Sequence, residues 1–61
     1  MKAIKTLGRY VIVSLSQRDK EQHNTTSDYA CILKDEMDFP ANLRELDMEC
    51  ESLQEAIDFI N

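Results

Sequence analysis

Two short apolar segments, residues 10–15 and 29–33, most constrain the fold of this chain. Their side chains are apolar on both parities, and the first is rich in β-branched residues, which is typical of strands buried on much of both faces. Between them, residues 17–28 contain no apolar side chain and include the single histidine, His23. The pattern predicts an antiparallel pair of strands joined by an exposed polar loop over residues 17–28.

The C-terminal twenty residues have two interpretations. In the first, residues 45–51 form a third strand, because apolar and acidic side chains alternate strictly there. Ser52 then caps a helix, with Glu55 completing a capping box. The apolar face of this helix consists of Leu53, Ala56, Ile57 and Ile60. The four acids of the strand face outward in one row: Glu45, Asp47, Glu49 and Glu51.

In the second interpretation one long helix begins at Pro40. Its apolar seam repeats at spacings of three and four and consists of Leu43, Leu46, Cys50, Leu53, Ile57 and Ile60. Helix propensity favours this alternative, because Asp and Glu are poor strand formers. The capping box and the marginal stability of a two-stranded sheet favour the third strand.

We therefore predict one α+β domain over residues 1–61, a three-stranded antiparallel meander with one C-terminal amphipathic helix packed on one face. A β-hairpin with one long helix from Pro40 is the alternative. Ile12 and Ile32 are expected to remain on the uncovered face, available to a partner. Gly8, the only glycine, either ends a helical turn or marks a bulge. The predicted core contains Val11, Val13, Leu15, Cys31, Leu33, Leu46, Met48, Leu53, Ala56, Ile57 and Ile60.

A chain of 61 residues buries a small core, so a partner or self-association is an expected source of additional stability. Neither a signal peptide nor an apolar stretch of about 20 residues is recognisable. We therefore expect a cytoplasmic protein without membrane contact, in which Cys31 and Cys50 are reduced.

The charge of the chain is distributed unevenly. Residues 1–34 carry six cations and three acids, whereas residues 35–61 carry nine acids and a single cation, Arg44. Because nucleic-acid affinity depends on a basic surface, direct binding to nucleic acid is not expected. The acidic excess is explained either by solubility or by a basic protein partner.

No motif for catalysis, a cofactor or a metal is present. The one histidine lies in a polar segment, and both cysteines lie in apolar patterns where buried, structural thiols are expected. His23, Cys31 and Cys50 match no zinc-ligand spacing. Asp35, Glu36 and Asp38 lack the glycine and distal glutamate of a calcium loop. We predict neither enzymatic activity nor a bound cofactor or metal.

The sequence favours a small acidic protein-binding module, an accessory or inhibitory factor that docks through its acidic C-terminal half. In size and charge it is analogous to many phage and mobile-element products. A row of acids spaced about 6.5–7 Å apart would also resemble a nucleic-acid backbone, although the same row protects an edge strand from aggregation. The alternatives are a structural subunit that forms a homodimer through its sheet and a thiol or metal sensor that uses Cys31 and Cys50.

Overall fold

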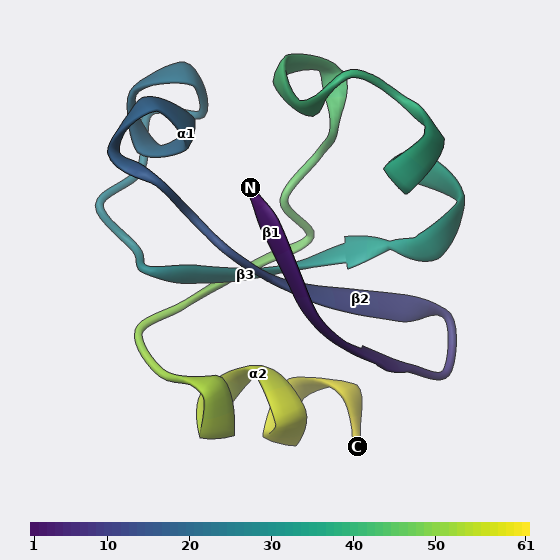
Figure 1. Ribbon diagram of the computed structural model, residues 1–61. Helices are drawn as coiled ribbons and strands as arrows, with labels where there is room; N and C mark the ends of the chain where they lie inside the picture. The colour runs from purple at the N-terminus through teal and green to yellow at the C-terminus, as the bar shows by residue number, and fades with distance from the viewer.

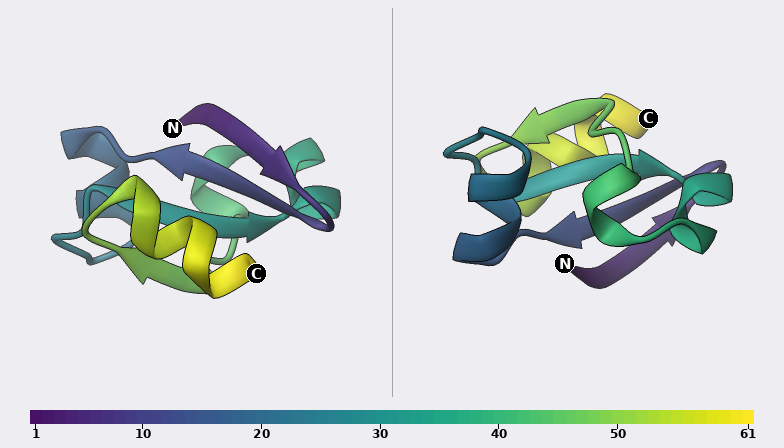
Figure 2. Two further views of the ribbon diagram at one scale, coloured as in Figure 1. Left: turned by 90° about the horizontal axis from the view of Figure 1, so that it is seen from below. Right: turned by 90° about the horizontal axis from the view of Figure 1, so that it is seen from above.

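The computed structural model describes all residues, 1–61, and consists of one antiparallel sheet that is covered on both faces (Figure 1). The strands lie in sequence order: β1 (Lys2–Leu7), β2 (Tyr10–Ser14), β3 (Tyr29–Leu33) and β4 (Met48–Cys50). Helix α2 (Leu53–Ile60) covers one face. The opposite side carries α1 (Gln17–Gln22) and two 3₁₀ turns, η1 (Lys34–Asp38) and η2 (Ala41–Leu43) (Figure 2).

This architecture confirms the α+β class and the C-terminal helix, but the sheet has four strands rather than three. The alternative of one long helix from Pro40 is wrong, because η2 and β4 lie between that proline and α2. Neither α1 nor α2 has the length and apolar character needed to cross a membrane.

Strands β2 and β3 form the centre of the sheet and are buried on both faces, as predicted. Ile12 lies opposite Cys31 and packs under α2, whereas Ile32 lies opposite Val11 and packs on the other face. The prediction that Ile12 and Ile32 remain free for a partner is wrong, since neither side chain is exposed. The second face is covered by half-buried side chains from three separate segments: Met1, Met37 and Leu46.

Strand β1 was not predicted as a strand. It pairs with β2 through a two-residue turn in which Gly8 has a φ of 60°, as the first central residue of a type II′ turn requires. The register shifts between Ala3 and Lys5, so a bulge lies at Ile4. Most of β1 is exposed, which explains why its sequence lacks the apolar pattern of a strand.

The first half of the predicted polar loop is a helix, α1, so the prediction of a loop over residues 17–28 is wrong there. Ser16 and Asp19 form a capping box that begins this helix. His23 is half-buried rather than freely exposed, and its Nε2–H donates to the carbonyl oxygen of Ala41 at 2.9 Å. This bond joins the end of α1 to η2.

Asp19 is the one buried acid, and it links the N-terminus to α1. Its Oδ2 accepts hydrogen bonds from the backbone N–H and the hydroxyl of Ser16, both at 2.9 Å, and lies 2.7 Å from the α-ammonium nitrogen of Met1. Burial alone raises the pKa of this carboxyl, but the bonds from the ammonium group and from Ser16 outweigh that effect and hold the pKa at about 2.

The C-terminal strand is shorter than predicted. Only Met48–Cys50 pairs with β3, and Leu46 packs on the face opposite to that of Cys50. Ser52 caps α2 as expected, accepting from the backbone N–H of Glu55 at 3.2 Å. The Glu55 carboxylate accepts from the N–H of Glu51 instead of from Ser52, so the reciprocal half of the capping box is absent.

We predict that Asp19→Asn lowers the free energy of unfolding by about 2 kcal/mol at pH 7, the value of a pKa held almost two units below the ordinary one. The stabilisation is fully present above pH 4, near the pKa of the unfolded chain, and is lost as the pH falls through about 2. Urea unfolding of the unmodified protein and of Asp19→Asn between pH 7 and pH 2 should show the difference in their free energies of unfolding shrink as the pH falls. Asp28→Asn, which removes an exposed partner of Lys20, is the matched control and should cost less than about 1 kcal/mol.

A second prediction concerns the two faces of the sheet. Because Ile12 and Ile32 are fully buried on opposite faces, Ile12→Val and Ile32→Val should each lower the free energy of unfolding by about 0.5–1.5 kcal/mol. Urea unfolding measures both, with exposed Ile4→Val as the control. A neutral effect at either buried position would contradict the two-faced core.

Candidate functional site

The four acids singled out from the sequence are all exposed, but the structure does not place them in one row. Glu49 lies in β4 opposite Ala30, and strand alternation places Asp47 and Glu51 on the same side, away from α2. Glu51 accepts a hydrogen bond from the hydroxyl of buried Ser27 at 3.2 Å. Glu45 precedes the strand and does not continue this alternation.

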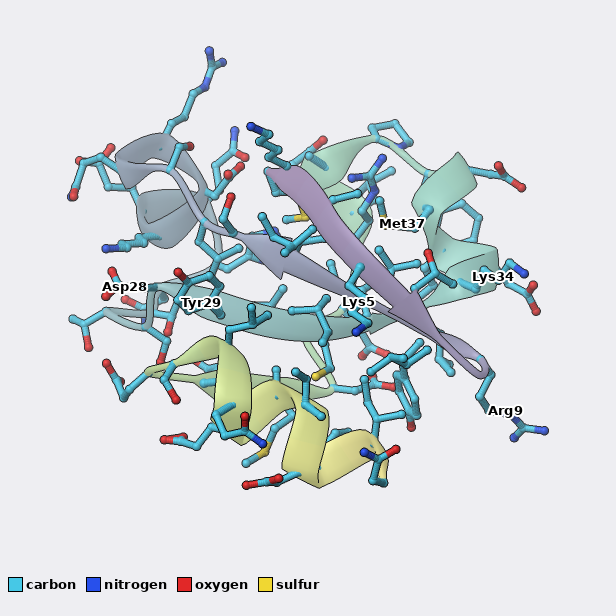
Figure 3. All side chains as sticks on the ribbon, turned by 60° about the horizontal axis from the view of Figure 1, so that its bottom comes forward. Lys5, Arg9, Asp28, Tyr29, Lys34 and Met37 are labelled. Carbon is cyan, nitrogen blue, oxygen red and sulfur yellow. The ribbon has the colours of Figure 1, made fainter.

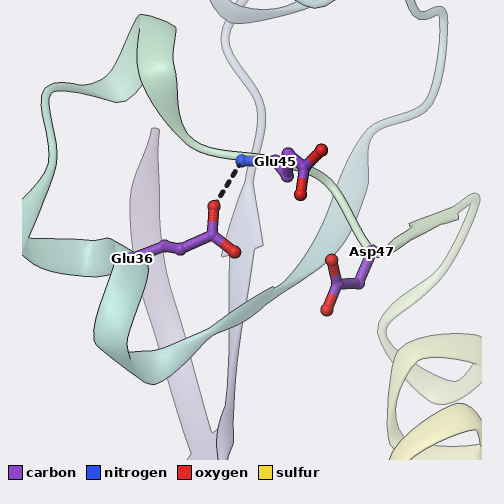
Figure 4. Close-up of side chains that lie close together, drawn as sticks. All are labelled: Glu36, Glu45 and Asp47. Atoms are coloured by element: carbon purple, nitrogen blue, oxygen red, sulfur yellow. Dashed lines mark hydrogen bonds between the residues drawn. The ribbon is translucent and has the colours of Figure 1, made fainter.

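Glu45 belongs instead to a group of three carboxylates that also contains Asp47 and Glu36 (Figure 4). Their carboxylate oxygens lie within 4.8 Å of one another. Glu36 comes from η1, and its Oε1 accepts from the backbone N–H of Glu45 at 2.8 Å. Glu36 was not predicted as a site residue, because nothing in its spacing shows that η1 folds back on residue 45.

Arg44 holds the connection between β3 and β4 in this conformation. Its Nε donates to the carbonyl oxygen of Phe39 at 2.9 Å, and its Nη2 donates to that of Met37 at 2.8 Å. The only cation of the acidic half is therefore bound to main-chain oxygens and forms no ion pair with a carboxylate. Phe39 and Leu43 of the same connection are 50% and 64% exposed. We call residues 34–47, together with Glu49 and Glu51, the acidic surface.

The negative charge of this surface is not compensated within the molecule. The structure contains two ion pairs, from the Met1 ammonium group to Asp19 and from Lys20 to Asp28. All nine acids of residues 35–61 lack a cationic partner within 4.0 Å. These charges therefore take no part in ion pairs within the molecule.

The carboxylates of Glu36, Glu45 and Asp47 are hard oxygen donors of the kind that calcium and magnesium ions take. Such ions require about six to eight and about six ligands respectively, so three side chains, of which only Glu45 and Asp47 are exposed, supply at most part of a site. One oxygen of Glu36 is already used by the Glu45 N–H. The three carboxylates therefore form a locally concentrated negative charge rather than a complete metal site.

Neither cysteine is activated as a nucleophile. Burial, together with the neighbouring Cys50 thiol, raises the pKa of Cys31 to about 12, and burial also raises the pKa of Cys50. Both thiols therefore remain protonated at neutral pH, and His23 bonds to a backbone carbonyl rather than to either of them.

The largest hollow, about 560 Å³, opens where the β1–β2 turn approaches the end of β3. It is lined by Gly8, Arg9, Leu33, Lys34 and Asp35, of which only one is apolar, unlike a typical small-molecule pocket. The labelled cations Arg9 and Lys34 extend outward from this end of the sheet (Figure 3). Comparisons with protein-family models, curated proteins and solved structures found no match.

We predict that Asp47→Asn raises the free energy of unfolding by a few tenths of a kcal/mol at low salt, because it relieves repulsion within the group of three carboxylates. The gain should disappear at about 1 M salt, where such repulsion is screened. Urea unfolding at both salt concentrations measures this effect. Glu21→Gln, at an exposed acid of α1, is the control and should leave the salt dependence nearly unchanged.

Proposed function

We propose that this protein is a small, non-enzymatic binding module that docks on a basic protein through the acidic surface. The observation that carries the proposal is that no acid of this surface has a cationic partner within the molecule. Complementary charge would accelerate association and select against acidic proteins. The only arginine of this half is held by main-chain oxygens and leaves the carboxylates accessible.

Exposed apolar side chains on the same connection support docking rather than solubility alone. Phe39 and Leu43 are at least half exposed and lie on the same connection as Glu36 and Glu45. Stable interfaces combine apolar anchors with a polar or charged rim, and these residues supply both components. A surface that needed only to remain soluble would not require an exposed phenylalanine there.

A basic nucleic-acid-binding protein fits this surface as a partner, and the module would then act as an accessory or inhibitory factor. Occupying a basic site would exclude the nucleic acid from it. Faithful mimicry of a phosphate backbone has weaker support, because Glu45 leaves the row and three carboxylates converge instead. We place this activity in the cytoplasm, with both cysteines reduced.

The alternative function, a homodimer formed through the sheet, is opposed by charge at both edges. Lys5 lies opposite Ile12 and Lys2 opposite Ser14, so both lysines lie on the α2 side of β1. Pairing two β1 edges would bring these lysines together, and pairing two β4 edges would bring acids together. Antiparallel pairing of β1 with β4 would place Lys5 and Glu49 on opposite faces, where their charges do not meet.

The test is affinity capture from the native host with Glu45→Lys, Asp47→Lys and Glu49→Lys combined. We expect capture of a basic protein by the unmodified chain, weakening as salt rises, and at least a tenfold loss of affinity for the triple variant. The charge-matched control replaces Glu21, Asp28 and Asp58 with lysine, outside the acidic surface, and should retain more binding. An equal loss of affinity in the two variants would show that only the net charge of the protein matters, which would contradict docking through the acidic surface.

Phe39→Ser combined with Leu43→Ser tests the apolar part of the same proposal. Loss of these exposed side chains should weaken capture while leaving its salt dependence intact, because the charges remain. Urea unfolding should change little, since both residues lie outside the core. Unchanged affinity would show that the partner recognises only the charges, which would contradict a role for Phe39 and Leu43 in docking.

A further inference from the structure

The face of the sheet under α2 contains both cysteines of the chain. Four residues there are fully buried: Ile12, Cys31, Cys50 and Ala56. Cys31 lies on β3 and Cys50 on the adjacent strand β4, and both side chains point toward the helix. The Cys31 thiol donates to the carbonyl oxygen of Ala56 in α2, with Sγ 3.7 Å from that oxygen. The two thiols therefore belong to one buried cluster, on neighbouring strands and beneath the same helix.

We propose that Cys31 and Cys50 form a redox pair that hydrogen peroxide converts into an intramolecular disulfide, locking β4 to β3. A thiolate of one cysteine attacks the peroxide, the O–O bond breaks, and a sulfenic acid and one water are formed. The second thiolate attacks the sulfenic sulfur, the S–S bond forms, and a second water leaves. Two thiol protons and two electrons thus pass to hydrogen peroxide, which is reduced to two waters.

The register indicates that β4 must move for the bridge to close. Cys31 lies opposite Met48 and Cys50 opposite Tyr29, so the two cysteines are diagonal neighbours. Diagonal Cα atoms lie about 7–8 Å apart in a regular ladder, whereas a disulfide spans about 4.4–6.8 Å. β4 has only three residues and forms an edge of the sheet, so it is the strand that is freest to approach.

Helix α2 controls access to the pair. Both thiols are fully buried beneath it, and Ala56 packs directly on them. A peroxide therefore reaches a thiol only when this eight-residue C-terminal helix opens. The raised pKa of both groups further slows the reaction while α2 is closed.

The bridge would close the connection that carries the acidic surface. Residues 34–47 lie between the two cysteines, so a Cys31–Cys50 bond joins both ends of that connection covalently. A closed loop restricts the unfolded chain more than the folded one, so the oxidised protein should resist unfolding better than the reduced protein.

The experiment treats the full chain with hydrogen peroxide and follows intact mass, disulfide mapping and urea unfolding. We expect loss of two hydrogens per monomer, one peptide pair joining Cys31 to Cys50, and a higher urea midpoint. Ser52→Ala, which removes the cap of α2, should accelerate oxidation roughly fivefold by favouring helix opening. Cys50→Ala is the matched control, and it cannot lose two hydrogens within one molecule.

Three results would overturn the proposal. The first is separate oxygen addition at each cysteine, and the second is a bridge between different molecules. The third is thiols that stay unmodified under peroxide in the folded protein yet form the bridge in urea, because β4 would then be unable to approach β3. A rate unaffected by Ser52→Ala would overturn the gating by α2.

Discussion

Burial of β2 and β3 on both faces is the constraint on which the rest of this small structure depends. One helix of eight residues is enough to cover one face, because its apolar side lies against β2, β3 and β4. The other face has no comparable helix and is covered by Met1, Met37 and Leu46 from three irregular segments. Each segment therefore needs a specific polar anchor that holds an apolar side chain over the sheet.

Those anchors account for the polar residues that do not simply face water. Asp19 binds the α-ammonium group of Met1 and so fixes the N-terminus next to α1, and His23 joins α1 to η2. Arg44 binds the carbonyl oxygens of Met37 and Phe39, which fixes the connection that places Met37 on the core. Hydrogen bonds and an ion pair thus hold these irregular segments against the sheet, whereas apolar packing holds α2 on the other face.

Elements of this fold are predictable from the sequence where a local pattern coincides with burial, and not where tertiary contacts decide. Strands β2 and β3 and the capped helix α2 were predicted from apolar periodicity and from Ser52. Strand β1 carries no such pattern because it is an exposed edge, and α1 was missed because its only buried side chain is an acid, Asp19. The signal for α1 was present in the spacing of Ser16 and Asp19, which fits a capping box. The group of three carboxylates could not be foreseen, because Glu36 reaches Glu45 through the path of η1.

The connection between β3 and β4 begins and ends on neighbouring antiparallel strands. Because its ends are held together by the sheet, the cost of altering its length grows only slowly with the number of residues. Met37 and Leu46 are the positions that the core fixes within it, while Phe39 and Leu43 face solvent. Selection can therefore rewrite most of this connection without rebuilding the fold, so that recognition and folding can evolve largely independently in a chain of 61 residues.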